Sequence, residues 1–277
     1  MTLEWEYDPA VAIPLAVTFI LYAVGLSKLW RRAGAGRGVT IAQSLLFASG
    51  WLSLVLALVS PLHEYAEHLF TAHMIEHEVL MTVAAPLLAL SRPIGIFLHA
   101  LPGSWRAIIV SGAHRKIIAG IWSRLTDPLT ATVLHAVAIW IWHIPALLDA
   151  TLTNEMLHRL QHLSFLITAL FFWWAIIRRP MMDYGIGALH VLATMMHTTL
   201  LGALLTLAPR VLYPVQTADA RLFGLTPWED QQLAGLVMWV PGGAIYMAAA
   251  LYLVALWLTS RLPKRGEALL QMRSANN

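Results

Sequence analysis

Seven long apolar stretches are the feature that most constrains what this chain can fold into. The mean hydropathy is +0.66, and 58% of the residues are hydrophobic. A helix needs about 20 mainly apolar residues to cross a bilayer, where its backbone must satisfy its own hydrogen bonds. We therefore predict an all-α polytopic membrane protein with seven transmembrane helices, forming a single integral membrane domain over residues 1–277. The predicted helices are residues 12–30, 41–60, 73–91, 128–148, 158–177, 186–207 and 231–258.

The basic residues predict the orientation of these helices. With seven spans, all but three of the 18 Lys and Arg residues fall on one side of the membrane; the exceptions are Arg159, Arg210 and Arg221. Cytoplasmic loops carry an excess of Lys and Arg, so the N-terminus is predicted outside and the C-terminus in the cytoplasm. Because the positive charge follows this topology, it does not indicate a nucleic-acid partner.

A further apolar segment, residues 105–122, is long enough to suggest an eighth span. It contains Arg115 and Lys116, which would then lie in the middle of the membrane. Counting it as a span would also remove most of the charge asymmetry between the two sides. We predict instead a basic helix that lies on the cytoplasmic face.

The chain contains twelve histidines and no cysteine, and all twelve histidines lie between His63 and His197. An ionisable side chain inside a membrane is expensive and usually faces a protein interior, where it serves a function. The absence of cysteine excludes disulfides and thiolate metal sites. Imidazole is therefore the main candidate metal ligand of this chain.

Three consecutive predicted helices each bring one imidazole to a similar depth near the outer face. A rise of about 1.5 Å per residue places His77 roughly 6 Å, His143 roughly 7 Å and His162 roughly 6 Å below the outer boundary. His73 and His158 each lie four residues earlier on the same helix faces, and are expected at the surface one turn above. The predicted metal ligands are His73, His77, His143, His158 and His162.

The sequence leaves the roles of several neighbouring residues open. Met81 lies on the same helix face as His73 and His77, one turn below His77. His197 is expected near the middle of the membrane on the sixth predicted helix, and Asp149 in an outer loop near the histidines. The outer loop 208–230 is either a lid or a docking surface. Glu76 and Glu78 begin a helix at the interface and are expected to be solvated.

This donor set is compatible with more than one function. Imidazole without thiolate suits late transition metals, and thioether together with imidazole favours copper over zinc. Histidines on facing helices can also hold haem, as in an electron carrier or a haem-delivery protein. A zinc-bound water beside Glu76, Asp149 or Glu155 would make a hydrolase, and a structural partner would use the histidines only for helix packing.

Three runs of residues together resemble a known family, and the resemblance covers essentially the whole chain. The first runs from Ala72-His-Met-Ile-Glu-His77 through Leu80-Met-Thr-Val-Ala-Ala-Pro-Leu-Leu88 to Arg92-Pro93. The other two are Trp142-His-Ile-Pro-Ala-Leu-Leu-Asp149 and His158-Arg-Leu-Gln-His162, the latter leading into Phe171-Phe-Trp-Trp174. In their order and spacing these runs resemble the CtaG family of cytochrome c oxidase assembly factors, of the multi-helix membrane type.

The resemblance implies a non-catalytic role in the maturation of haem-copper oxidases, by supplying or inserting copper. It implies a multi-pass protein of the bacterial inner (plasma) membrane, whose partner is an oxidase subunit or a periplasmic copper chaperone. Its motifs carry onto the same five histidines. The chain departs from the family pattern at Ala85, where proline is expected, and at Leu148, where tyrosine is expected; neither is a candidate ligand.

Overall fold

The computed structural model describes residues 8–178 and 183–261, and every regular element within these ranges is a helix. The C-terminus is predicted in the cytoplasm, and its residues 262–277 lie outside the described residues. In chain order the elements are α1 (Pro9–Ala33), α2 (Ile41–Leu58), α3 (Pro61–His68), α4 (Phe70–Glu78), η1 (Val79–Ala84), α5 (Ala85–Ser91), α6 (Pro93–Ala100), α7 (Gly103–Val110), α8 (Gly112–Leu125), α9 (Pro128–Trp142), α10 (Pro145–Thr153), α11 (Glu155–Arg178), α12 (Tyr184–Thr206), η2 (Ala220–Phe223), α13 (Pro227–Val237), η3 (Met238–Gly242) and α14 (Gly243–Arg261).

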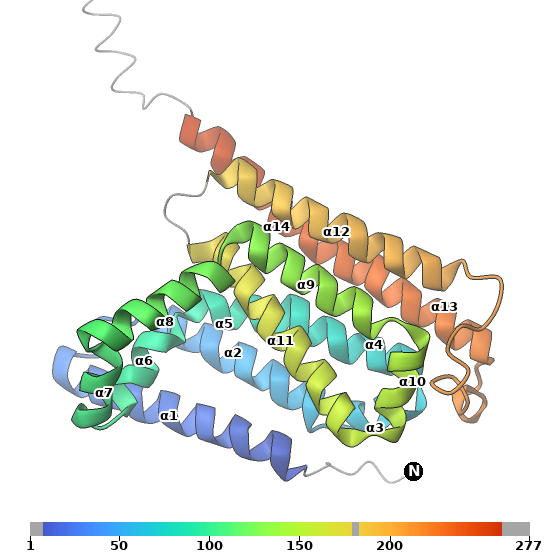
Figure 1. The fold of residues 1–277 in the computed structure, drawn as a ribbon, viewed down its shortest axis with the longest axis horizontal. Coiled ribbons are helices and arrows are strands. Elements are labelled where there is room, and N and C mark those ends of the chain that lie inside the picture. The colour runs from blue at the N-terminus through green and yellow to red at the C-terminus, as the bar shows by residue number, and fades with distance from the viewer. Residues whose placement is uncertain (1–7, 179–182, 262–277) are drawn as a thin grey trace, which may run out of the picture.

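The long helices run side by side, with short helices at both ends of the bundle (Figure 1). Helices α3 and α10 lie at one end, and α6, α7 and α8 lie at the other. η1 and η3 are π-helical turns that interrupt two of the long helical segments. Such turns shift the register of the side chains that follow them, and they are frequent at functional sites.

Within the described residues, six helical segments are long and apolar enough to cross a membrane, so the chain is a multi-pass membrane protein. The seventh predicted span is represented by α9, which has 15 residues. It reaches the length of a span only together with α8, at a bend of 64°. The six segments are Pro9–Ala33, Ile41–Leu58, Phe70–Ser91, Glu155–Arg178, Tyr184–Thr206 and Pro227–Ser260.

The helix predicted at residues 128–148 is divided in the structure. α9 ends at Trp142, and α10 begins at Pro145 after the extended residue Ile144 (φ −67°, ψ 123°). Proline disfavours the helical conformation in the residue before it, and this explains the break. The division places His143 at the end of a helix instead of inside one.

The basic helix predicted at residues 105–122 is likewise two helices. α7 and α8 are separated by Ser111, which has an extended backbone (φ −64°, ψ 149°). Trp105 and Ile117 are largely exposed, so this segment is not buried in the bundle. Exposed apolar side chains interspersed with Arg115 and Lys116 are the pattern of a helix at a membrane surface.

Close helix packing holds α13 against α12. An added Cβ atom on Gly235 would lie 2.6 Å from the carbonyl oxygen of Gly202 and 2.7 Å from the backbone nitrogen of Thr206. Both are backbone atoms that a rotamer change cannot move. Glycine at both positions lets the two helix backbones come this close, as small residues do at the interfaces of membrane helices.

We expect Gly235→Ala to destabilise the protein by about 1–3 kcal/mol, because the new methyl group must push α13 away from α12. Tryptophan fluorescence during thermal unfolding in detergent would measure the change. The matched control is Gly120→Ala on α8, where an added Cβ atom meets nothing within 4 Å. Unfolding of both variants at the temperature of the wild type would show that the contact between α12 and α13 tolerates the methyl group.

Candidate metal site

A cluster of histidines lies at the end of the bundle where α3, α4 and the start of α11 meet. α4 carries His73 and His77, and α11 carries His158 and His162. The spacing of four residues puts each pair on one helix face. Their ring centroids are accordingly 4.2 Å apart on α4 and 4.4 Å apart on α11.

The two pairs face each other across the interface of α4 and α11. The ring centroids are 5.1 Å apart for His77 and His162, and 5.5 Å apart for His73 and His158. Two imidazoles that share a metal ion, with metal–nitrogen bonds of about 2 Å, hold their centroids about 5 Å apart. The structure therefore brings four of the five predicted residues to spacings that suit a shared ion.

The structure adds two residues, His63 and Glu76, to this cluster. His63 on α3 stacks on His158, with ring centroids 5.4 Å apart, and its Nδ1 is 2.7 Å from Glu76 Oε1. The other carboxylate oxygen, Oε2, is 3.5 Å from His162 Nε2. Two groups have ligand atoms within 4.8 Å of one another, and Glu76 belongs to both: His63, Glu76 and His162, and His73, Glu76 and His158.

Burial corrects two expectations from the sequence. Glu76 and Glu78 are not solvated; they are 0% and 7% exposed. His73 and His158 are not at the surface either, since they are 0% and 8% exposed. The sequence prediction places these residues by their distance from the end of one helix. It does not include the short helix α3 or the segment after α12, which pack at this end of the bundle.

His143 lies apart from the other four predicted residues. Its ring contacts Phe165, with centroids 6.3 Å apart, and Phe165 in turn contacts His77 at 4.7 Å. His143 is still close enough to His73 and His77 to interact with both electrostatically. Its Nδ1 donates to the carbonyl oxygen of Ile139 at 2.7 Å.

The remaining open residues do not join the cluster. Met81 is buried in the hydrophobic core, and its carbonyl oxygen accepts a hydrogen bond from Trp173 Nε1 at 2.8 Å. His197 on α12 interacts electrostatically with His135. Asp149 on α10 is half-buried; burial raises its pKa, and its charge acts on Tyr213.

The loop 208–230 packs over the histidine end of the bundle. The Tyr213 hydroxyl donates to the carbonyl oxygen of His143 at 2.6 Å, and its ring contacts Phe70. Gln216 donates to the carbonyl oxygen of Ala66 at 3.0 Å, and Asp219 pairs with His68 Nδ1 at 2.7 Å. These contacts hold residues 208–226, called here the roof segment, against α3, α4 and the end of α9 at the histidine end of the bundle.

Asp230 positions the helix that carries His73, Glu76 and His77. Helix α4 has no capping side chain of its own, because Leu69 occupies its N-cap position. Asp230 on α13 instead accepts hydrogen bonds from the backbone nitrogens of Phe70 and Thr71, both at 2.9 Å, and from Thr71 Oγ1 at 2.7 Å. It is fully buried. Sequence reasoning missed it, because the residue lies 160 positions from the helix that it caps.

The ring nitrogens of the cluster provide the chemical argument for a bound ion. A buried polar atom without a hydrogen-bond partner is costly, and such atoms are rare in folded proteins. Five imidazoles at this end have at least one such nitrogen among the described residues. These atoms are Nδ1 and Nε2 of His73 and His77, and Nε2 of His143, His158 and His162. Neutral imidazoles with free lone pairs, beside a carboxylate, fit a transition-metal ion.

Comparison with known proteins places the chain in a family. Residues 20–260 match the cytochrome c oxidase caa3 assembly factor family. Uncharacterized proteins of Mycobacterium bovis and Mycobacterium tuberculosis are each 29% identical over 179 residues, and one of Mycobacterium leprae is 25% identical over 183 residues. The match covers 62% of this chain but 26% of each relative. No solved structure matches the chain. Because the family match extends over most of the sequence, the chain belongs to the cytochrome c oxidase caa3 assembly factor family.

Proposed function

We propose that this protein binds a copper ion at the histidine cluster, on the outer side of a bacterial plasma membrane, and hands it to a haem-copper oxidase during assembly. Its family supplies the assembly role. The observation that carries the copper proposal is the set of buried, unpartnered imidazole nitrogens on α4 and α11. Copper is cargo here, so the protein itself catalyses no reaction.

The ligands of the ion would come from the two facing helices. His77 and His162 are the closest pair across the interface, and His73 and His158 form the next pair outward. Glu76 lies within ligand distance of both groups and would supply a negative charge. His143 would not bind the ion in this arrangement, because the ring of Phe165 lies between it and His77. It would become a further ligand only if Phe165 moved.

The donor set favours copper over the alternatives. Imidazole nitrogens bind Cu(II) more tightly than Zn(II) at an equivalent site. The thioether of Met81 does not contribute, because Met81 packs in the core, so the preference for copper rests on the imidazole nitrogens alone. Haem fits less well, because the imidazoles of α4 and α11 contact one another directly and leave no space for a macrocycle between them.

The arrangement of the termini supports the proposed orientation. Asp8, which caps α1, forms an ion pair with Arg159 at the start of α11, at 2.8 Å. The N-terminal end of α1 therefore lies on the histidine side of the bundle. The loops with most of the basic residues lie at the opposite end, and the positive-inside rule assigns that end to the cytoplasm. An oxidase subunit or a periplasmic copper chaperone would thus meet the roof segment 208–226.

Metal analysis of the purified protein tests this proposal. We expect the wild type to retain about one copper per chain after exposure to excess copper and desalting, and to show no Soret absorption. Glu76→Gln should bind copper at least about tenfold more weakly, because loss of a ligand or of its outer-shell partner costs about 10- to 100-fold. Glu64→Gln on α3 is the matched control, since Glu64 belongs to neither metal group.

The assembly role is tested in cells that lack the gene for this chain. Oxidase purified from them should contain less copper, and the wild-type chain should restore it where Glu76→Gln does not. Full copper in the oxidase without the chain would overturn delivery. A purified protein that carries haem in place of copper would replace the proposal by the haem-delivery alternative.

A further inference from the structure

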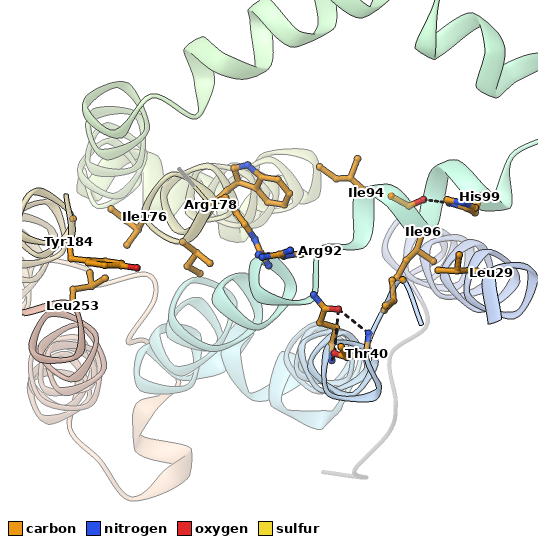
Figure 2. A pocket seen from close by; sticks show the side chains of 17 residues that line it. Leu29, Thr40, Arg92, Ile94, Ile96, His99, Ile176, Arg178, Tyr184 and Leu253 are labelled. Carbon is orange, nitrogen blue, oxygen red and sulfur yellow. Dashed lines mark hydrogen bonds between the residues drawn. The ribbon is translucent and has the colours of Figure 1, made fainter. Parts of the chain in front are cut away.

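A large cavity lies at the end of the bundle opposite the histidine cluster. It has a volume of about 1110 Å³ and is lined by the α1–α2 loop, α6 and the near ends of α11, α12 and α14. Arg92 and Arg178 extend into it and approach one another (Figure 2), and Thr40 and His99 are also among its lining residues. The two arginines are near enough to interact electrostatically, which for like charges is repulsion.

This pair of positive charges has no acidic neighbour in the cavity. None of the described residues that line it is Asp or Glu. Arg178 donates to the carbonyl oxygens of Ala89 and Leu90, at 2.9 and 2.5 Å, so that its guanidinium is held in place by neutral groups. Two guanidinium groups side by side in a cavity without a carboxylate form a local excess of positive charge that favours binding of an anion.

The backbone of Arg92 points to a function for its side chain. Arg92 joins α5 to α6 in the left-handed conformation (φ 57°, ψ 51°), and among the described residues no other non-glycine residue has a positive φ. This conformation costs about 1–2 kcal/mol for a residue with a Cβ atom, and glycine adopts it freely. Strain of this kind clusters at ligand-binding positions. Glycine would form this turn at lower cost, so the presence of arginine indicates a role for its side chain.

A second cavity adjoins the first on the side of the membrane-spanning helices. It has a volume of about 420 Å³, and the two cavities share Ile94 and Trp174 in their linings. Its walls are apolar and aromatic apart from the hydroxyl group of Thr18. The other wall residues include Phe47, Trp51, Leu54, Leu166 and Leu170. A cavity that holds two arginines thus lies next to an apolar groove, with Ile94 and Trp174 in the wall of both.

We infer that these two cavities form one binding site for an anionic glycerophospholipid. Its phosphate would lie between Arg92 and Arg178, and an acyl chain would lie in the groove beyond Ile94 and Trp174. Guanidinium groups bind phosphate oxygens through paired hydrogen bonds. Basic pockets between helices on the cytoplasmic side of membranes select acidic head groups. The site is independent of copper binding at the other end.

Native mass spectrometry of the full chain in detergent tests this inference with three probes: dioleoylphosphatidylglycerol, dioleoylphosphatidylcholine and inorganic phosphate. We expect phosphatidylglycerol to bind at least about fivefold more tightly than phosphatidylcholine, which corresponds to about 1 kcal/mol for the net charge. Arg92→Gln should weaken phosphatidylglycerol about fivefold and reduce that preference. Arg106→Gln, an exposed charge change on α7, should leave it unchanged.

A second variant separates a lipid from a free anion. Ile94→Trp fills the junction between the two cavities without changing the charge, and Ile94 is exposed enough to accept a larger side chain. We expect it to weaken the lipid and to leave inorganic phosphate unaffected. The inference is overturned if inorganic phosphate binds as tightly as phosphatidylglycerol and Ile94→Trp has no effect. It is also overturned if Arg92→Gln and Arg106→Gln retain the lipid equally.

Discussion

The double variant His77→Ala and His162→Ala is expected to lose more than about 100-fold in copper affinity, measured by competition with a copper chelator. These rings are the closest cross-helix pair, with centroids 5.1 Å apart, so both helices lose a ligand at the same point. Loss of even an outer-shell partner weakens metal binding about 10- to 100-fold, and two direct ligands should cost more.

The matched control removes two imidazoles that do not belong to the cluster. His99 donates to the carbonyl oxygen of Gly95 at 2.7 Å, and His190 contacts Thr132 Oγ1 at 3.0 Å. His99→Ala with His190→Ala should retain copper at wild-type affinity.

Thermal unfolding separates loss of ligands from loss of the fold. Copper should raise the unfolding temperature of the wild type and of the control, since a ligand that binds only the folded state stabilises it. It should have no effect on the His77 and His162 variant, which should still unfold cooperatively. Unchanged copper stoichiometry in that variant would contradict the proposed site.

The second large effect is expected at Asp230. We expect Asp230→Ala to lower the free energy of unfolding by about 3–5 kcal/mol, because it removes the buried carboxylate that accepts from the backbone N–H groups of Phe70 and Thr71 at the start of α4. The variant should also bind copper more weakly, since α4 carries His73, Glu76 and His77. Denaturant unfolding in detergent, followed by the copper competition assay, measures both quantities.

Two further variants separate the cap from a general loss of acidic charge. Asp230→Asn keeps one carbonyl oxygen and should be intermediate in stability. Glu229→Ala removes the exposed neighbouring carboxylate, which caps α13 only locally through Thr226, and should cost about 1 kcal/mol without a change in copper affinity. A loss of stability for Asp230→Ala no larger than that for Glu229→Ala would show that the cap does not hold α4.

Much of the cluster was predictable, because the periodicity of a helix is local. A spacing of four residues puts His73 with His77, and His158 with His162, in any fold in which those segments are helical. The two pairs come to the same level because each stands near the N-terminal end of a segment predicted to run inward from the outer face, so the two segments are parallel. The break after His143 also had a local signal, since Pro145 follows two residues later.

The long-range contacts had no such signal. Glu76 looks like an interfacial acid in the sequence, and it is buried only because α3 brings His63 onto it at 2.7 Å. Asp230 looks like one of two acids at the start of a helix, and its partners are 159 and 160 positions away. The roof segment 208–226 is held at this end of the bundle by Tyr213 and Gln216, which reach back to the end of α9 and to α3.

The sequence by itself determined that this is a helical membrane protein and which imidazoles share a helix face, because hydrophobic burial in lipid and helical periodicity act over a few residues at a time. Only the tertiary structure decided which acid joins the imidazoles, which carboxylate caps α4, and that the cluster is roofed from solvent. These depend on which distant side chains satisfy buried polar groups, and that pairing is settled by packing across the whole bundle.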